Sequence, residues 1–351
     1  MAHEIIDIAG RKVGAAQPCF IIAEAGVNHN GSIEMARRLV DVAVEAEADA
    51  VKFQTFKAER LVAPHAAKAE YQTHTTDPGE SHLEMLRSLE LSLEMHVDLM
   101  SYCRENGIIF ISSPFEEGSS DLLDELAVPA FKIPSGEITN LPFLAHVAAK
   151  GKPMIVSSGM SYISEVEGAV RTIEGAGNND FVLLHCVSNY PTDPADVNLR
   201  AMQTMASAFR APAGYSDHTL GIEIPLAAVA LGACVIEKHF TLDSTLTGPD
   251  HRASLEPDQL TAMVRGIRTV EAALGHGRKK PAASEANTAS VARKSLVAAS
   301  DLQPGTMLAE EMIAVMRPGT GLPPVMRPHI VGRTLRTPVR AGELITLDNL
   351  E

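Results

Sequence analysis

The sequence predicts an α/β fold: a parallel (β/α)8 barrel of the TIM type, followed by a small, mostly-β domain. Short β-like runs alternate with helix-like runs from the start of the chain to about residue 275. Eight such units in roughly 250 residues match a β/α barrel in number and size. The main rival is a doubly wound open sheet, which rarely needs eight evenly spaced strands. No GxGxxG motif follows the first strand, so the dinucleotide-binding fingerprint of that fold is missing.

The expected strands are rich in Val, Ile, Phe and Ala, as an enclosed barrel requires. They cover residues 19–25, 50–55, 108–114, 130–135, 153–159, 181–187, 211–217 and 234–240. Amphipathic patterns between them predict helices, among them SIEMARRLVDVAVEAEA from residue 32, LEMHVDLMSYCRENG from residue 93 and EVEGAVRTIEGAG from residue 165. The last two patterns end in Gly, which is a common helix terminator.

The alternation stops in a polar stretch, residues 274–290, which is rich in Gly, Pro, Ser and Lys and is typical of a linker. We therefore expect a barrel domain over residues 1–275, a linker over residues 276–290 and a second domain over residues 291–351.

The expected second domain has short β-like runs and frequent Pro and Gly. It contains a weak internal repeat, in which GTMLAEEMI from Gly305 resembles GELITLDNL from Gly342. Between the two copies lies the loop MRPGTGLPP, with Arg317 near its tip.

The composition excludes several classes of function. The formal net charge of -14 disfavours binding to nucleic acid, although an anionic substrate remains compatible if basic groups converge in one pocket. No apolar run approaches the roughly 20 residues needed to span a bilayer, and the start, MAHEIIDIAGRKVG, does not resemble a secretory signal. Cys19, Cys103, Cys186 and Cys234 show no CxxC spacing and are expected to be buried free thiols. We expect a cytoplasmic protein without a nucleic-acid or membrane partner.

Two lysines close β-like runs where the apolar sequence stops, Lys52 in VKFQ and Lys132 in AFKIPSGE. The C-terminal ends of barrel strands are where this fold places its active site. Together with Ser135 and Ser157, the two ammonium groups suit a ligand that carries a phosphate and a carboxylate. Two alternatives stay open: each Lys could reach solvent or pair with a neighbouring Glu, or one could form a Schiff base.

Two histidines follow the last two expected strands, His218 in GYSDHT and His239 in IEKHFT. Neighbouring strands lie about 4.8 Å apart, so two imidazoles at equivalent heights could share one ion. Imidazoles completed by carboxylate or water suit Mn, Zn, Fe or Co, and Asp217 or Glu237 could orient them. A lone His is more often structural, and His185 in the apolar run FVLLHCV is expected to be a satisfied core residue.

Three further residues are candidates for the site. Glu24 ends the first expected strand and precedes the polar turn AGVNHNG, where a carboxylate can act as a base, as an acid or as a partner of a metal ligand. Tyr190 in SNYP and Asp250 in TGPDH are plausible groups for binding hydroxyls.

The motifs IAEAGVNHNG, VKFQT, FKIPSGE, SSGM, HCVSNYPT, GYSDHT, IEKHFT and GPDH, in this order, resemble those of the sialic acid synthase family. The tail with its RPGTG loop is similar to the antifreeze-like (SAF) domain of that family. The resemblance implies condensation of phosphoenolpyruvate with an open-chain N-acylated aminosugar, which gives a nine-carbon 2-keto acid and phosphate. It also implies a divalent metal, usually Mn²⁺ with Mg²⁺ or Co²⁺ as alternatives, and a domain-swapped homodimer.

The resemblance further implies a role for each matching residue. The metal would be bound by His218 and His239. Phosphoenolpyruvate would be held by Lys52, Lys132, Ser135, Ser157 and Ser216. Glu24 would position or deprotonate the water that attacks C2. The sugar would face Gln54, Glu137, Tyr190 and Asp250, and Arg317 would reach into the partner's site and contact the N-acyl group.

Two positions depart from the neuraminate synthases, which often have Asn where this chain has Ser188 and His where it has Phe53. These departures leave the acceptor open between N-acetylmannosamine and 2,4-diacetamido-2,4,6-trideoxymannose. A less polar wall at Phe53 would favour the deoxy sugar.

Two other functions stay open. One is a phosphoenolpyruvate-dependent aldol synthase that uses an aldose phosphate, for which the sequence offers no third strand-end Lys or Arg. The other is a non-catalytic protein whose tail binds a surface such as ice, although the tail is rich in Arg.

Overall fold

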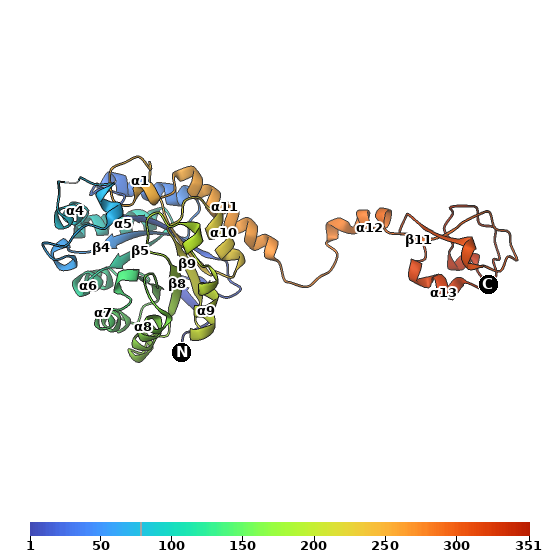
Figure 1. Ribbon diagram of the computed structural model, residues 1–351, viewed down its shortest axis with the longest axis horizontal. Helices are drawn as coiled ribbons and strands as arrows, with labels where there is room; N and C mark the ends of the chain where they lie inside the picture. Colours follow the sequence, from blue (N-terminus) through green and yellow to red (C-terminus); the bar gives the residue numbers. More distant parts are fainter. Residues whose placement is uncertain (78) are drawn as a thin grey trace. The chain divides into compact units, whose positions relative to one another are not determined.

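The structure is a computed structural model that describes residues 1–77 and 79–351. It divides into two compact units, Met1–Gly275 and His276–Glu351. Figure 1 shows the first unit as helices arranged around central strands. The expected linker contains regular structure, because the 3₁₀ turn η4 (Ala283–Glu285) and helix α12 (Ala286–Ala292) begin within it.

The first unit is a closed barrel of parallel strands, which confirms the predicted fold class. Its strands are β3 (Phe20–Gly26), β4 (Ala50–Thr55), β5 (Ile109–Pro114), β6 (Phe131–Ile133), β7 (Met154–Ser157), β8 (Phe181–Cys186), β9 (Ala213–Asp217) and β10 (Val235–His239). Each strand pairs in parallel with the next one along the chain, and β10 closes the ring on β3. All the expected strands are therefore present, with ends that differ by a few residues.

One main helix follows each barrel strand. The helices are α1 (Ile33–Glu45), α5 (Leu93–Glu105), α6 (Glu117–Glu125), α7 (Leu141–Ala148), α8 (Ile163–Gly175), α9 (Arg200–Phe209), α10 (Glu223–Ala230) and α11 (Pro257–Leu274). Ser32 and Ser92 begin α1 and α5, because each side chain accepts a hydrogen bond from an amide of the first turn. Gly107 and Gly177 have positive φ just beyond α5 and α8, as expected for helix terminators.

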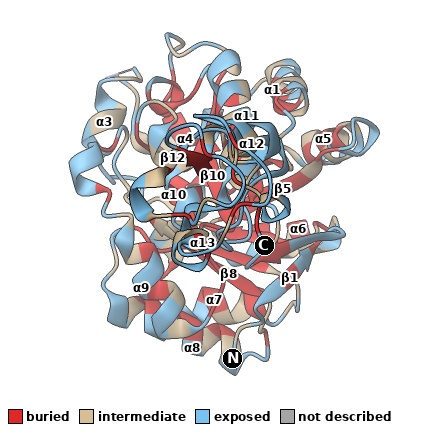
Figure 2. Cartoon of the chain, turned by 90° about the vertical axis from the view of Figure 1, so that its right-hand side faces the viewer, coloured by how far each residue is buried: buried red, intermediate tan, exposed pale blue. Residues whose placement is uncertain are grey.

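Side chains of the strands alternate between the barrel interior and the layer under the helices. At the N-terminal ends of the strands the interior is apolar, with a cluster that includes Phe20, Ile22, Ala50, Ile111, Ile155, Val182 and Val235. A hairpin of β1 (Ile5–Ile8) and β2 (Arg11–Gly14), which was not predicted from the sequence, adds Ile6, Ile8 and Val13 to this cluster. Each of these side chains stabilises the fold by roughly 1.5–3 kcal/mol on burial. Figure 2 shows the strands mostly buried and the outer sides of the helices exposed.

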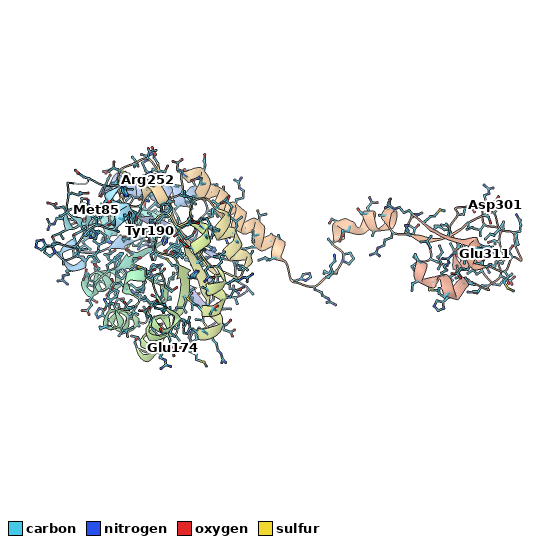
Figure 3. All side chains as sticks on the ribbon, in the orientation of Figure 1. Met85, Glu174, Tyr190, Arg252, Asp301 and Glu311 are labelled. Atoms are coloured by element: carbon cyan, nitrogen blue, oxygen red, sulfur yellow. The ribbon has the colours of Figure 1, made fainter. Side chains whose placement is uncertain are left out.

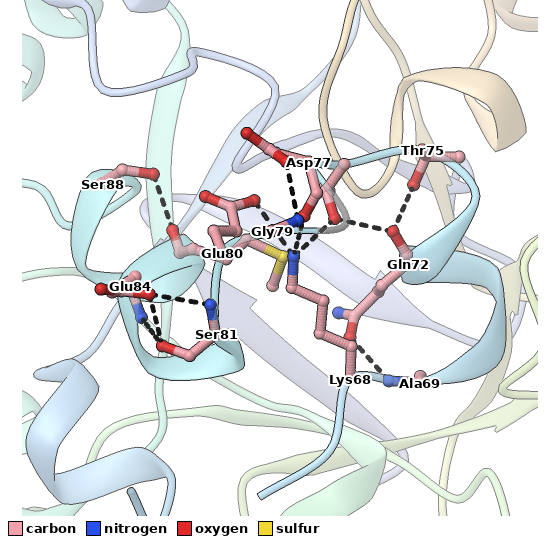
Figure 4. Close-up of polar contacts among 12 residues, drawn as sticks. Lys68, Ala69, Gln72, Thr75, Asp77, Gly79, Glu80, Ser81, Glu84 and Ser88 are labelled. Atoms are coloured by element: carbon pink, nitrogen blue, oxygen red, sulfur yellow. Dashed lines mark hydrogen bonds and ion pairs between the residues drawn. The ribbon is translucent and has the colours of Figure 1, made fainter. Parts of the chain in front are cut away.

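The connection between β4 and α5 is long and carries three short helices, α2 (Ala58–Leu61), α3 (Glu70–Thr73) and α4 (His82–Ser88). We call residues 56–92 the β4–α5 segment. Lys68 organises its centre: its Nζ donates to Thr76 Oγ1 at 3.0 Å, to the carbonyl oxygen of Asp77 at 2.8 Å and to Glu80 Oε1 at 3.1 Å (Figure 4). These contacts join the residue range before α3 to the connection between α3 and α4, and both helices contribute residues to the cavity described below.

The second unit has its own small apolar core around a hairpin of β11 (Ser295–Ala298) and β12 (Ile313–Met316). The weak repeat is confirmed, because both copies adopt the same local structure. Gly305 and Gly342 have φ of 85° and 81°, and each is followed by an isolated bridge and by a 3₁₀ helix, η5 (Glu310–Met312) or η7 (Leu347–Asn349). Across both units, no helix of the described residues is long and apolar enough to cross a membrane.

Candidate active site

The C-terminal ends of the barrel strands surround a cavity of about 420 Å³. This is the end at which β/α barrels carry their reactive groups. The cavity is lined by the following predicted site residues: Glu24, Lys52, Gln54, Lys132, Ser135, Ser157, Tyr190, Ser216, His218, His239 and Asp250. Gly26 shows how closely they converge, since a Cβ at this position would lie 3.1 Å from Glu24 Oε1 and 3.5 Å from His239 Cε1. Figure 3 labels Tyr190, which lies over the middle of the first unit.

Lys132, on β6, is fixed in the wall of the cavity. Its Nζ donates to Ser157 Oγ at 2.7 Å, and it lies 3.4 Å from Glu237 Oε1 on β10. Burial lowers the pKa of Lys132, while the Glu237 carboxylate opposes this shift. The lysine therefore does not reach solvent, and it pairs with a carboxylate while facing the cavity.

Lys52, on β4, is held in the same way by a second carboxylate. Its Nζ lies 2.7 Å from Glu24 Oε1 and donates to Ser113 Oγ at 3.1 Å. Gln54 Nε2 donates to the same Glu24 oxygen at 3.3 Å. Glu24 Oε2 has no hydrogen-bond partner among the described residues, so this oxygen is available to a ligand in the cavity.

Glu237 joins the two lysines. Its Oε1 accepts a hydrogen bond from Ser216 Oγ at 2.9 Å, and its Oε2 lies 4.0 Å from Lys52 Nζ. The sequence left Glu237 and Asp217 as alternatives for orienting the histidines, but the contacts of Glu237 are with the lysines and Ser216. Two ammonium groups can therefore lie in one buried cavity because a carboxylate lies between them.

The carboxylates of the cavity have different pKa shifts. Burial raises the pKa of Glu24 to about 7, although Lys52 opposes the shift. Burial likewise raises the pKa of Asp250 to about 6, against the effect of His218. Burial also acts to raise the pKa of Glu237, but Lys132 and Lys52 outweigh it and the pKa is lowered. Glu237 is therefore ionised at neutral pH, while Glu24 and Asp250 can take up and release protons near neutrality.

The two predicted histidines lie together, with ring centroids 5.4 Å apart. His218 Nδ1 lies 2.7 Å from the carbonyl oxygen of Val187 and donates a proton there, so Nε2 carries the lone pair when the ring is neutral. Burial acts to lower the pKa of His218, but Cys186 outweighs it and the pKa is raised. His239 Nδ1 is buried without a hydrogen-bond partner in the part of the chain that the structure describes. Burial, together with His218, lowers the pKa of His239 well below its usual value, so its imidazole is neutral at neutral pH.

These histidines fit a divalent cation as two of its ligands. Imidazole nitrogens are donors that Mn²⁺, Zn²⁺, Fe²⁺ and Co²⁺ use, and the Asp250 carboxylate lies beside them, with Oδ2 3.8 Å from His239 Nδ1. Over residues 1–77 and 79–351, no group of three or more His, Cys, Asp or Glu side chains is placed to hold a metal. An ion here would take its other ligands from water and substrate, as open catalytic sites do.

Two aromatic residues cover the histidines. The Tyr190 ring lies 4.1 Å from the His218 ring, centroid to centroid, and Tyr71 from α3 stacks on Tyr190 at 5.1 Å. Tyr71 was not predicted from the sequence, because a contact between α3 and the loop after β8 leaves no local pattern. The cysteines are buried free thiols, as predicted, but Cys186 also lines the cavity, and its Sγ lies 3.8 Å from His218 Nδ1.

An apolar wall completes the cavity on the side of the β4–α5 segment. Its side chains belong to one small cluster and line the cavity: Val27, Phe56, Met85, Leu86 and Leu89. The cavity is therefore charged where the barrel strands end and apolar under this segment.

Several predicted positions lie elsewhere. Glu137 does not line the cavity, because it lies in a 3₁₀ turn beyond the end of β6, where its carboxylate accepts a hydrogen bond from Asn140. The expected wall at Phe53 is wrong: Phe53 faces away from the cavity and stacks on Phe110 at 5.7 Å. Ser188, by contrast, does line the cavity.

Three other assignments have different outcomes. Asp217 lies behind the cavity against Lys238, and not against the histidines. His185 is a satisfied structural residue, as predicted, because its Nε2 lies 2.6 Å from the carbonyl oxygen of Val197. Arg317 is exposed and follows β12 in the second unit.

A closed β/α barrel with paired ammonium groups and paired imidazoles at the C-terminal ends of its strands defines an enzyme fitted to an anionic substrate. The NeuB family model matches residues 39–279, and the SAF domain model matches residues 293–351. The chain therefore belongs to the NeuB family.

Three relatives that are named as synthases or synthetases cover 82–96% of the chain. The N,N'-diacetyllegionaminic acid synthase of Legionella pneumophila is 48% identical over 96% of this chain and 96% of its own. That of Campylobacter jejuni is 46% identical over 93% of this chain and 98% of its own. The crystal structure of the N-acetylneuraminic acid synthetase of Leptospira borgpetersenii, in complex with citrate, is 37% identical and aligns with a TM-score of 0.72, covering 82% of this chain and 96% of that one.

Proposed function

We propose that this chain condenses phosphoenolpyruvate with open-chain 2,4-diacetamido-2,4,6-trideoxymannose, which gives a nine-carbon 2-keto acid and phosphate. The observation that carries the proposal is the placement of Lys52 and Lys132 in the same buried cavity as His218 and His239. Two relatives that are 48% and 46% identical are named as N,N'-diacetyllegionaminic acid synthases, which supports this acceptor.

The lysines would hold phosphoenolpyruvate. Lys132, with Ser157, and Lys52, with Ser113, each present a fixed ammonium group beside a hydroxyl donor, and these are the groups that bind a phosphate and a carboxylate. Asp250, with a pKa of about 6, can be protonated near neutrality and so lower the negative charge that an anionic ligand meets.

Glu24 is placed to act on water. In the proposed sequence, C3 of phosphoenolpyruvate attacks the aldehyde carbon, and the aldehyde oxygen takes up a proton. Water then adds to the cationic C2 and gives a proton to Glu24, whose Oε2 is the oxygen without a partner among the described residues. Cleavage of the bond between C2 and the phosphate-bearing oxygen then releases phosphate, which takes up the proton of the C2 hydroxyl group, and the 2-keto group remains. A base with a pKa of about 7 is well matched to this task at neutral pH.

His218 and His239 would hold a divalent metal, with Mn²⁺ expected and Mg²⁺ or Co²⁺ as alternatives. When bound there, such an ion supplies a Lewis acid that polarises the sugar aldehyde. Val187 would keep the His218 ring in the orientation that leaves Nε2 free, through its carbonyl oxygen.

The apolar wall supports a deoxy and unphosphorylated acceptor. Phe56, Met85 and Leu89 offer a surface for methyl groups, which this acceptor carries at C6 and on both acetamido groups. Among the described residues that line the cavity, Lys52 and Lys132 are the only Lys or Arg side chains, and both are assigned to phosphoenolpyruvate. An aldose phosphate would need a further cation.

The remaining expectations concern the assembly. We infer a cytoplasmic, domain-swapped homodimer in which Arg317 of one chain contacts the N-acyl group in the barrel of the other. The match of the SAF domain model to residues 293–351 and the exposure of Arg317 support this inference.

The test is an acceptor panel with mass-resolved products. Phosphoenolpyruvate is incubated with 2,4-diacetamido-2,4,6-trideoxymannose, N-acetylmannosamine or N-acetylmannosamine 6-phosphate, with EDTA or with added Mn²⁺. We expect phosphate release and a nine-carbon product with the first sugar and Mn²⁺. A preference for the 6-phosphate would contradict the acceptor assignment, and no product with any sugar would contradict the reaction.

Two variants with matched controls test the site in the same assay. At a phosphoenolpyruvate concentration near the wild-type KM, Lys132→Ala and His239→Ala should each strongly reduce phosphate release. Lys152→Ala and His185→Ala, which change a lysine and a histidine of the same barrel outside the cavity, should retain it. Unchanged release in either of the first two variants would make the site assignment wrong.

A further inference from the structure

A buried ion pair lies on the outer side of the strands that carry the two histidines. Lys238 precedes His239 on β10, and Asp217 precedes His218 at the end of β9. Because side chains alternate along a strand, both point away from the cavity. Their side chains are 0% exposed, and Lys238 Nζ lies 2.5 Å from Asp217 Oδ2. The two residues are also directly paired in the register between β9 and β10.

The contacts of this pair involve the residues directly before and after His218, which are Asp217 and Thr219. Lys238 Nζ also donates to the carbonyl oxygen of Thr219, so it holds the residues on both sides of His218. The Asp217 carboxylate in turn accepts hydrogen bonds from Thr219 N and from Thr219 Oγ1, both at 3.0 Å. The backbone around His218 is thus tied to the residue that immediately precedes His239.

Stability alone is a poor reason for this arrangement. Moving two charges out of water costs several kcal/mol each, and apolar residues of similar size often stabilise a protein equally well in such places. The neighbouring outward positions on the same strands, Tyr215 and Ile236, belong to the apolar core under the helices. Unlike an apolar pair, the charged pair makes directional hydrogen bonds, since Lys238 donates both to Asp217 and to the carbonyl oxygen of Thr219.

We propose that Asp217 and Lys238 form a positioning clamp that sets the separation and orientation of His218 and His239 for a shared divalent cation. The inference rests on the proposed function in one respect, since it takes the two histidines as the metal ligands. The clamp acts through the backbone, and neither of its residues lines the cavity.

The test separates positioning from stability through three variants. Lys238→Met removes the ammonium group and leaves Asp217 buried beside Thr219. The double variant Asp217→Asn/Lys238→Met also removes the opposing charge, so it should recover much of the lost thermal stability without restoring the clamp. Thr219→Val keeps the ion pair and the side-chain shape, and it removes a single hydrogen bond to Asp217.

Arg268→Met is the matched control. Arg268 also binds a carboxylate and a backbone carbonyl, with Nη2 2.9 Å from Asp49 Oδ2 and Nη1 2.9 Å from the carbonyl oxygen of Cys19. These partners precede β4 and β3, at the opposite ends of the strands from the cavity. The variant should lose stability without a change at the histidines.

The readouts are the Mn²⁺ dissociation constant, from the electron paramagnetic resonance signal of the free ion, and the unfolding temperature in EDTA. We expect Mn²⁺ binding to weaken by about 10- to 100-fold in both Lys238→Met and the double variant, by a few-fold in Thr219→Val, and to stay unchanged in Arg268→Met. Wild-type Mn²⁺ affinity in the double variant would overturn the proposal. So would a wild-type protein that binds no Mn²⁺, in which case phosphate release without added metal decides separately whether the proposed reaction stands.

Discussion

Replacing Glu24 by Gln should stabilise the protein at alkaline pH while it strongly slows the reaction. The pKa of Glu24 is raised by burial from 4.5 to about 7. A carboxyl group with a raised folded pKa contributes stability that is fully present below pH 4.5 and is lost as the pH rises through 7. At about 1.4 kcal/mol for each pH unit, this loss amounts to about 3 kcal/mol. Gln is a neutral analogue of the protonated acid and escapes the loss.

Glu237 provides a contrast in the same cavity. Its pKa is lowered, since Lys132 and Lys52 outweigh the effect of burial, so its stability contribution is present above its unfolded pKa and is lost as the pH falls through the folded value. Glu237→Gln should therefore destabilise the protein at pH 8.5, because it leaves two buried ammonium groups without the carboxylate between them. Two chemically identical substitutions are expected to act in opposite directions.

The assay is urea unfolding in EDTA between pH 5 and pH 8.5, with the barrel transition followed separately from that of the SAF domain. Glu24→Gln should gain about 3 kcal/mol over the wild type at pH 8.5 and much less at pH 5. Its phosphate release, measured in parallel with Mn²⁺, should fall by about 100-fold or more, since a general base contributes about 100- to 10,000-fold. A Glu24→Gln protein that is less stable than the wild type at pH 8.5, or a Glu237→Gln protein that is more stable, would refute the assignment of charges.

Three further predictions concern the reaction. Lys132→Met should raise the KM for phosphoenolpyruvate by about 10- to 100-fold, because a charge-assisted hydrogen bond contributes about 1.5–3 kcal/mol. If this KM stayed unchanged while the KM for the sugar changed, Lys132 would not belong to the phosphoenolpyruvate site. The kcat/KM of the wild type should rise with pH through about 7 as Glu24 ionises in the free enzyme, and a flat kcat/KM profile over pH 6 to 8 would remove Glu24 as the base. Mixed chains of His239→Ala and Arg317→Ala should regain activity in hybrid dimers, and confirmed heterodimers without recovery would exclude exchange of domains between subunits.

The barrel could be predicted from the sequence because its strands are apolar on both faces near their N-terminal ends. Val, Ile and Phe fill the interior as well as the layer under the helices, so each strand forms a continuous apolar run that is visible without any partner. The N-terminal hairpin lacks such a run. Its strands have four residues each, and only Ile6, Ile8 and Val13 face the barrel, so its role depends on contacts that are distant in the sequence.

The residues at the strand ends were predictable because the apolar runs of the barrel strands make any polar residue at their ends conspicuous. Lys52, Lys132 and His239 interrupt apolar runs, and an interruption at the C-terminal end of a barrel strand points to the cavity. Residues from loops were harder to place. Tyr71 and Met85 lie on the β4–α5 segment and line the cavity. Contacts such as that between Lys68 and Glu80 hold this segment together, and they leave no periodic pattern in the sequence. Glu137 was predicted to face the sugar but does not line the cavity. It lies in a 3₁₀ turn beyond the strand, where side chains no longer alternate between the two faces.

The alternation of side chains along a strand also explains why the prediction that Phe53 lines the cavity was wrong. The same rule, applied to the sequence alone, would have given the correct orientation. If Lys52 and Gln54 both face the cavity, Phe53 between them must face the helices. The same rule applied to IEKHF places Glu237 beside His239 inside the barrel and sends Lys238 outward, where a single Lys in an apolar layer requires a buried anion. Asp217, whose neighbours Ser216 and His218 both face the cavity, is the acid that alternation puts on that outer face of the adjacent strand. A charge on the outer face of a barrel strand, directly before a histidine that faces the cavity, is thus a signal that can be searched for in the sequences of other β/α barrels.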